Sequence, residues 1–148
     1  MSFSFREAGL ADASELATIE RLVFSTPWTE AAFQSEFETN EYAHYLLLER
    51  DGEIVGYAGI WRVLDEGHIT NIAVKPDYQG QHLGEALLRE LLREASEQGV
   101  LRVTLEVRVS NTRAQNLYRK LNFQNGALRR RYYPDNAEDA LVMWVDLS

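Results

Sequence analysis

Residues 71–92, NIAVKPDYQGQHLGEALLRELL, predict a strand, a turn and a helix in direct succession. A short apolar run is followed by a proline turn, then by Gly80 and Gly84 with polar residues between them, and finally by a leucine-rich segment. The first turn of a helix leaves several N–H groups without partners and carries a partial positive charge, so a phosphate can bind there without any lysine. An ordinary strand-to-helix turn and an anion site are equally compatible with this loop alone.

Two familiar phosphate motifs are absent from the sequence. It has no GxxxxGK[ST] segment, which excludes a P-loop, and no GxGxxG followed by a ribose-binding acidic residue, which argues against a Rossmann dinucleotide site. An anion site at this turn would therefore differ from both.

Short strands and amphipathic helices occupy the rest of the chain. Asp51-Gly52 lies between two apolar runs and is a strong hairpin signal. The order of elements mixes hairpins with strand–helix–strand units, which predicts an α+β fold (mixed α/β) in a single domain over residues 1–148. The expected strands are 2–7, the two halves of 43–61, 68–74, 101–109, 127–133 and 140–147, and the expected helices begin near Asp12, Thr29, Leu83 and either Ser110 or Asn111. The helix after Asp12 is expected to place Leu16, Ile19, Leu22 and Val23 on its apolar face.

The composition excludes several kinds of site. The chain has no cysteine, so disulfides and thiolate chemistry are excluded, and this is compatible with a reducing cytoplasm. A net charge of -8 argues against binding of duplex nucleic acid. No apolar run approaches the roughly 18 residues of a membrane span, and the N-terminus lacks the basic and apolar regions of a signal peptide. We therefore expect a cytoplasmic protein with neither a membrane nor a nucleic-acid partner, in which the run 129–131, RRR, is a solvated strand end.

Several segments together resemble the GCN5-related N-acetyltransferases (GNAT family). QGQHLG, residues 79–84, is similar to the family's pyrophosphate-binding motif Q/R-x-x-G-x-G/A, with His82 where the family usually has glycine. The segments TPW, NIAVKPDYQ, LEVRVSNTRAQNLYRKLNF and RRRYYPDNAEDALVM extend the likeness over nearly the whole chain and are more specific. The resemblance implies a GNAT fold, with a central mixed and mostly antiparallel sheet flanked by helices.

The resemblance also implies acetyl-CoA as the cosubstrate. In the family, the backbone of the strand NIAV aligns the pantetheine amides and the acetyl carbonyl, and the following loop holds the pyrophosphate. A negative φ at His82 would be tolerated in that loop, whereas a positive φ would strain the histidine backbone. The cofactor-binding residues implied in this way are Ile72, Ala73, Val74, Gln79, Gly80, Gln81, His82, Leu83, Gly84, Glu85 and Asn111.

Acetyl transfer from a thioester to an amine needs a base, donors for the oxyanion and an acid for the leaving thiolate. On the strand 103–109, Thr104, Glu106 and Arg108 share one face. By periodicity alone, Glu106 is a solvent-facing carboxylate or a partner of Arg108. By the resemblance, Glu106 occupies the family's general-base position and acts directly or through water.

Tyr118 is the candidate general acid, because a tyrosine hydroxyl stays protonated at neutral pH. By pattern alone it is a core tyrosine on an apolar helix face, and Asn111 is a helix cap. The resemblance places Tyr118 at the general-acid position and gives Asn111 a part in holding the CoA arm.

The remaining aromatic and histidine residues allow further hypotheses. Trp28, Tyr132 and Tyr133 are either core aromatics or, as the resemblance implies, a wall for the acceptor peptide. His44 and His82, like His68, show no metal-ligand spacing, and no metal site is predicted. His68 lies near the strand that should line the acceptor groove, which makes it a candidate for a minor role as a second base.

The resemblance implies a basic protein N-terminus as the acceptor: the N-terminal alanine of small-subunit ribosomal protein eighteen. Lysine side chains, a polyamine or another small amine are alternative acceptors. A non-catalytic acyl-CoA-binding domain is a different class, and the presence of both Glu106 and Tyr118 argues against it.

Overall fold

A seven-stranded mixed sheet in the order β1-β2-β3-β4-β5-β7-β6 forms the centre of the protein. The computed structural model describes residues 2–147. The strands are β1 (Phe3–Glu7), β2 (Ala43–Arg50), β3 (Glu53–Val63), β4 (Glu66–Val74), β5 (Arg102–Arg108), β6 (Gln124–Arg129) and β7 (Ala140–Asp146).

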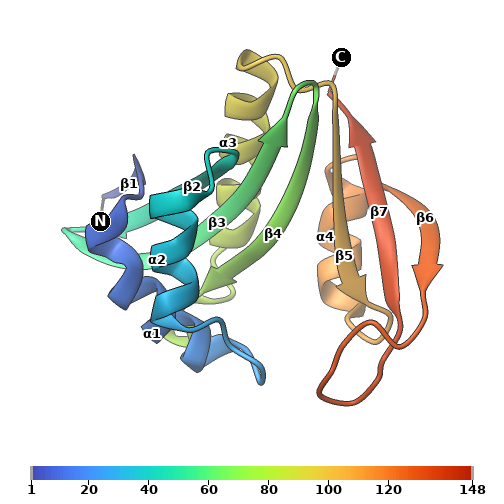
Figure 1. The fold of residues 1–148 in the computed structure, drawn as a ribbon, viewed down its shortest axis with the longest axis horizontal. Coiled ribbons are helices and arrows are strands. Elements are labelled where there is room, and N and C mark those ends of the chain that lie inside the picture. Colours follow the sequence, from blue (N-terminus) through green and yellow to red (C-terminus); the bar gives the residue numbers. More distant parts are fainter. Residues whose placement is uncertain (1, 148) are drawn as a thin grey trace.

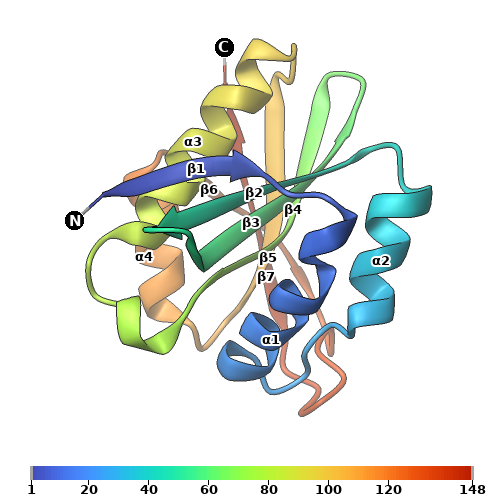
Figure 2. The ribbon, with the colours of Figure 1, turned by 90° about the vertical axis from the view of Figure 1, so that its left-hand side faces the viewer.

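Helices cover both faces of this sheet (Figures 1 and 2). The pair α1 (Ala13–Val23) and α2 (Glu30–Thr39) lies on one face, and α3 (Leu83–Glu97) and α4 (Thr112–Lys120) lie on the other. Two short 3₁₀ helices, η1 (Leu10–Asp12) and η2 (Pro76–Tyr78), precede α1 and α3. No helix within residues 2–147 is long and apolar enough to cross a membrane.

Each helix pair buries one of two apolar cores. Leu87, Leu88 and Leu91 of α3 are completely buried against the sheet, in the larger core. Leu16 and Ile19 of α1 belong to the second core, on the opposite face. Side chains of β5 alternate between the two faces of the sheet. Val103, Leu105 and Val107 enter the larger core, and the polar residues between them point to the opposite face.

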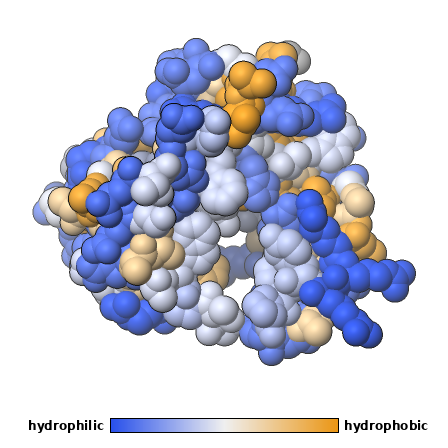
Figure 3. Space-filling model, in the orientation of Figure 1, coloured by the Kyte–Doolittle hydropathy of each residue, from blue (hydrophilic) through white to orange (hydrophobic). Residues whose placement is uncertain are grey.

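The strands β4 and β5 are parallel, whereas every other strand pair is antiparallel. They pair over three positions only, from Glu66 with Arg102 to His68 with Thr104. Both strands continue beyond that point, and Figure 1 shows them diverging. Figure 3 shows an opening between the two halves of the molecule at this level. The divergence leaves the facing edges of β4 and β5 without a neighbouring strand.

A β-bulge interrupts β4 shortly after its last contact with β5. Gly59 of β3 lies opposite Asn71, and the next residue, Ile60, lies opposite Ile69, so Thr70 is an extra residue on β4. The side chains of Thr70 and Asn71 hydrogen-bond to each other at 2.7 Å. The bulge shifts the strand register just before the segment Ile72–Val74.

Most expected elements and two of the expected caps are confirmed. Thr29 Oγ1 accepts from Ala32 N at 3.1 Å, and Asn111 Oδ1 accepts from Ala114 N at 3.1 Å. The hairpin at Asp51-Gly52 is also confirmed, with positive φ at both residues.

α1 begins directly after Asp12, its N-cap residue, as expected, but the Asp12 carboxylate accepts from Gly9 N and Arg6 and makes no cap hydrogen bond to that helix. Two other sequence expectations were wrong. Leu22 is 55% exposed, because α1 turns a different row of side chains to the core. The strand predicted over 127–133 starts earlier and ends at Arg129, where the chain leaves the ladder with β7.

Candidate active site

Glu106 lies on β5 two residues beyond the last pair with β4, on the face that α1 and α2 cover. Its side chain is only 10% exposed. Three groups from three segments surround the carboxylate: His68 Nε2 is 2.7 Å from Oε1, Tyr132 donates to Oε1 at 3.4 Å, and Arg129 Nε is 3.7 Å from Oε2. Neither a solvent-facing Glu106 nor a pair with Arg108 is present.

These neighbours keep Glu106 ionised. Burial raises the pKa of Glu106, but the hydrogen bond and charge of His68, with Arg129 and Tyr132, outweigh burial and leave the pKa below its ordinary value. An ionised carboxylate that is largely shielded from bulk water can accept a proton from a group brought into the opening between the strands.

Tyr118 lies on α4, partly buried, with its ring 5.8 Å from that of Phe123. Burial raises the pKa of Tyr118 to about 12, with a smaller contribution from Tyr133. The hydroxyl is therefore a proton donor throughout the neutral range. Its ring packs against the larger core, as the pattern of α4 predicts.

The loop after β4 turns sharply into α3. Gln79 Nε2 donates to Val74 O at 2.9 Å, so this side chain ties the loop to the end of the strand. Gly80 has φ +83° and His82 has φ +61°, both in the left-handed region. His82 therefore has the positive φ that strains a histidine backbone, not the negative φ that would be tolerated.

The start of α3 is open to ligands. The first helical hydrogen bond runs from Ala86 N to His82 O, so the N–H groups of Leu83, Gly84 and Glu85 precede it in the first turn. Leu83 anchors the turn in the core, while Gln81 and His82 are exposed. A cavity of about 380 Å³ adjoins the turn, lined by His82, Glu85, Ala86, Arg89 and Lys120.

Glu85 forms ion pairs with two cationic side chains beside the first turn of α3. Its carboxylate accepts from Lys120 at 2.8 Å and from Arg89 at 3.0 Å, and these hydrogen bonds lower the pKa of Glu85. The residue proposed for cofactor binding is therefore held by two cations that flank the cavity.

The loop between β6 and β7 lies beside Glu106 and contacts the loop between α1 and α2. Arg108 stacks on Tyr133 at 4.0 Å and pairs with Asp135 at 2.9 Å and Glu138 at 3.2 Å. Asp135 also accepts from Ser25 Oγ at 2.8 Å, which joins the two loops. Tyr132, 44% exposed, projects from the same segment to Glu106.

Trp28 lies in the segment between α1 and α2. Its ring packs on Phe33 at 5.4 Å, and its backbone N–H donates to Glu20 Oε1 at 2.9 Å. The tryptophan is partly buried and packs against the second core.

Sequence reasoning missed the buried carboxylate of Glu20, which is 1% exposed. Its Oε2 accepts from the Tyr57 hydroxyl and from Asn71 Nδ2 at 3.2 Å, next to the bulge on β4. Burial and the charge of Glu20 raise the pKa of Tyr57 well above its ordinary value. The i, i+4 spacing from Leu16 to Glu20 could have placed this glutamate on the inward face of α1.

His44 pairs with Glu94 of α3 at 3.0 Å, away from the pairs around Glu106. Within residues 2–147 there is no group of three or more His, Asp or Glu side chains arranged to hold a metal ion.

Comparison with known proteins identifies the fold. The sequence pattern of the acetyltransferase (GNAT) family matches residues 13–123, which span α1 to the end of the β5–α4 unit. The chain belongs to the acetyltransferase (GNAT) family. The GNAT fold predicted from the sequence is thereby confirmed, and the protein is an N-acetyltransferase.

Individual GNAT relatives match nearly the full chain. A Bacillus subtilis (strain 168) protein, provisionally named a ribosomal protein bS18-alanine N-acetyltransferase, is 49% identical over 143 residues, covering 97% of this chain and 95% of its own. The Escherichia coli (strain K12) enzyme of that name is 42% identical over 132 residues, covering 88% of each chain. A crystal structure of the Escherichia coli ribosomal-protein-S18-alanine N-acetyltransferase superposes with a TM-score of 0.93 at 37% identity, covering 99% of this chain and 95% of that one.

Proposed function

We propose that this GNAT enzyme uses acetyl-CoA to acetylate the N-terminal alanine of the small-subunit ribosomal protein bS18. The observation that carries the chemistry is the shielded Glu106 carboxylate at the point where β4 and β5 part. The choice of acceptor rests on the two relatives named for that reaction, at 49% and 42% identity. An acceptor of this kind implies a cytoplasmic enzyme.

Acetyl-CoA suits the groups along β4 and α3. A Cβ atom added at Gly80 or Gly84 would meet no other atom within 4 Å, so a diphosphate has room to approach the backbone there. The first turn of α3 supplies N–H groups and a positive dipole end. The free edge of β4 at Ile72–Val74 offers backbone groups that the pantetheine amides could pair with as a strand would.

The proposed chemical steps use Glu106 as the base and Tyr118 as the acid, the roles that the family resemblance implies for them. Glu106 takes a proton from the acceptor's α-ammonium group, directly or through water, which frees the nitrogen lone pair. The nitrogen attacks the acetyl carbonyl carbon, and N–H groups on the free edge of β4 are donors for the oxyanion. As the tetrahedral intermediate collapses, the C–S bond breaks, Tyr118 donates a proton to the thiolate, and the excess proton on the new amide nitrogen returns to Tyr118.

The loop contacts favour a chain end over an internal side chain as the acceptor. The Ser25–Asp135 hydrogen bond joins the α1–α2 and β6–β7 loops beside Glu106. A flexible N-terminus can pass between joined loops, whereas a lysine within a folded surface needs room for the chain on both sides. The net charge of -8 also attracts a basic protein.

Mass spectrometry of two matched peptides tests this proposal. The first peptide begins with alanine followed by arginine; the second has the same sequence with a blocked α-amine and one free lysine. We expect acetylation of the first peptide at its α-amine and little reaction of the second. Aspartate in second position should lower kcat/KM, more at low salt, because salt screens charges over about 10 Å at 0.1 M. If the lysine peptide or spermidine reacts faster, the ribosomal acceptor is wrong.

A further inference from the structure

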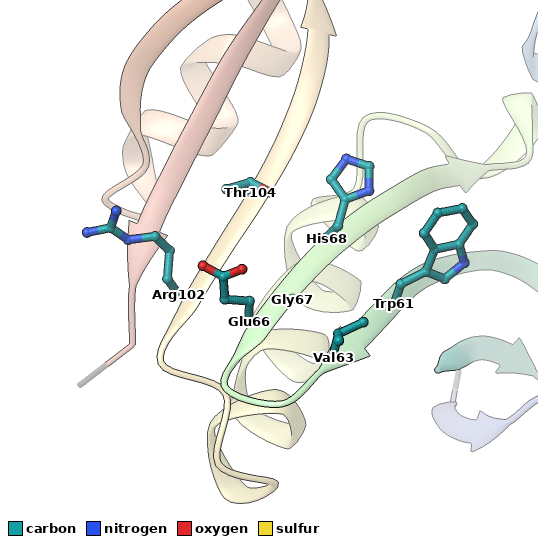
Figure 4. A pocket seen from close by; sticks show the side chains of 7 residues that line it. All are labelled: Trp61, Val63, Glu66, Gly67, His68, Arg102 and Thr104. Atoms are coloured by element: carbon teal, nitrogen blue, oxygen red, sulfur yellow. The ribbon is translucent and has the colours of Figure 1, made fainter. Parts of the chain in front are cut away.

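The imidazole of His68 contacts the Glu106 carboxylate across the point where the two strands separate. His68 occupies the last position of β4 that pairs with β5, opposite Thr104. Its Nε2 reaches past Thr104 to Glu106 Oε1 at 2.7 Å. Figure 4 shows the ring projecting from β4 towards the gap between the diverging strands. His68 lines a hollow of about 180 Å³.

The surroundings of His68 couple it to Glu106 specifically. The Trp61 ring of β3 lies 6.1 Å away. Glu66 of β4 and Arg102 of β5 line the hollow, but Arg102 pairs with Asp146 at 2.7 Å. Tyr132 of the β6–β7 loop also contacts Oε1, at 3.4 Å, and Arg129 of β6 lies 3.7 Å from Oε2. Among residues 2–147, Glu106 is the acidic group within hydrogen-bonding distance of the His68 ring.

We propose that His68 is a positioning residue for the base: it fixes Oε1 of Glu106 so that Oε2 takes the acceptor's proton, and its charge sets how readily that proton is taken. This inference rests on the proposed role of Glu106 in acetyl transfer. The proton that Oε2 accepts passes to water, one for each amide bond formed.

A change of charge on the ring distinguishes this role from simple support. An imidazole changes its charge between about pH 5 and 8. An imidazolium next to a carboxylate favours the ionised form and so weakens the carboxylate as a base. A charged ring next to Glu106 should therefore give lower activity than a neutral one. A side chain that donates the same hydrogen bond without a charge should remove any dependence of activity on the charge of the ring.

The test compares His68→Gln and His68→Ala with the wild-type enzyme. Each rate is divided by the wild-type rate at the same pH, with the same acceptor, so that titration of the acceptor amine cancels. For His68→Gln, we expect the ratio of the variant kcat/KM to the wild-type kcat/KM to lie within about threefold of one at pH 8.5. This ratio should rise by about three- to tenfold as the pH is lowered to 6. For His68→Ala we expect kcat to fall about tenfold, with the KM for acetyl-CoA unchanged.

His44→Gln is the matched control, because it alters a histidine that also contacts glutamates, Glu94 at 3.0 Å and Glu7 at 3.6 Å, away from Glu106. Its ratio should stay flat with pH. A flat ratio for His68→Gln, or an unchanged kcat for His68→Ala, would overturn the inference. The ratios are measured with whichever amine the wild-type enzyme acetylates, so failure of the alanine peptide alone would reject the acceptor and still test His68.

Discussion

Replacing Glu106 with glutamine should remove the base and leave its surroundings in place. The glutamine carbonyl can still accept from His68 Nε2, which lies 2.7 Å from the present Oε1. The volume of the buried side chain hardly changes, so the packing around it should persist. The substitution therefore isolates proton acceptance from shape.

The expected loss in kcat is about 10²–10⁴-fold, the range for removal of a general base, which equals about 2.7–5.5 kcal/mol in the activation barrier. The loss should lie towards the upper part of that range, because a side chain only 10% exposed leaves little room for a water molecule to replace it. The KM for acetyl-CoA should change little, since Glu106 lies on β5 and the proposed cosubstrate groups lie on β4 and α3.

Release of the CoA thiol can be followed directly with a thiol reagent, because the protein itself contains no cysteine. Glu94→Gln is a suitable control, since it alters a glutamate that also contacts a histidine, at 3.0 Å, but on α3. Removal of a general base predicts at least about a hundredfold loss of kcat. If Glu106→Gln keeps more than about a tenth of the wild-type kcat near pH 7.5, Glu106 is not the base.

Three further predictions concern other parts of the site and the fold. Gly84→Val should weaken acetyl-CoA binding strongly and Gln81→Ala only slightly, as measured by calorimetry; the reverse order would indicate recognition by side chains. Tyr118→Phe should lower kcat by about 10²-fold. Because the pKa of Tyr118 is raised to about 12, loss of its proton should not lower the wild-type kcat below pH 10. The kcat profiles of the wild type and of Tyr118→Phe should therefore have the same shape up to that pH. Gly59→Ala should destabilise the fold by about 1–3 kcal/mol, because its Cβ would lie 2.3 Å from Tyr45 Cε1 and 2.7 Å from Thr70 Oγ1; thermal unfolding checks this against Gly9→Ala, where a Cβ meets nothing within 4 Å.

Local patterns predicted the parts of the fold that local interactions determine. The alternation in β5 placed Glu106 on the polar face of its strand, and the cap signals at Thr29 and Asn111 are present in the structure. The turn at Asp51-Gly52 was predictable for the same reason, since its conformation depends on two adjacent residues.

Contacts between distant segments could not be predicted in this way. Nothing in the sequence around Glu106 indicates that Arg129 and Tyr132 approach it from beyond α4, because that depends on how β6 and β7 are placed beside β5. The spacing from Leu16 could place Glu20 on the inward face of α1, but it does not reveal its partners Tyr57 and Asn71, which come from β3 and β4. The bulge at Thr70 inserts a single residue, which a period of two does not reveal.

The separation of β4 from β5 after three residue pairs has a consequence for the lifetime of the protein. Two strand edges face each other inside one fold, and an extended molecule that carries amide groups can pair with an edge of this kind. A ligand that binds the folded state alone stabilises it by mass action, by about 2.7 kcal/mol when its concentration is 100 times its Kd. Resistance to heat and to proteolysis should therefore rise and fall with the supply of acetyl-CoA, which would tie the abundance of the enzyme to the metabolic state of the cell.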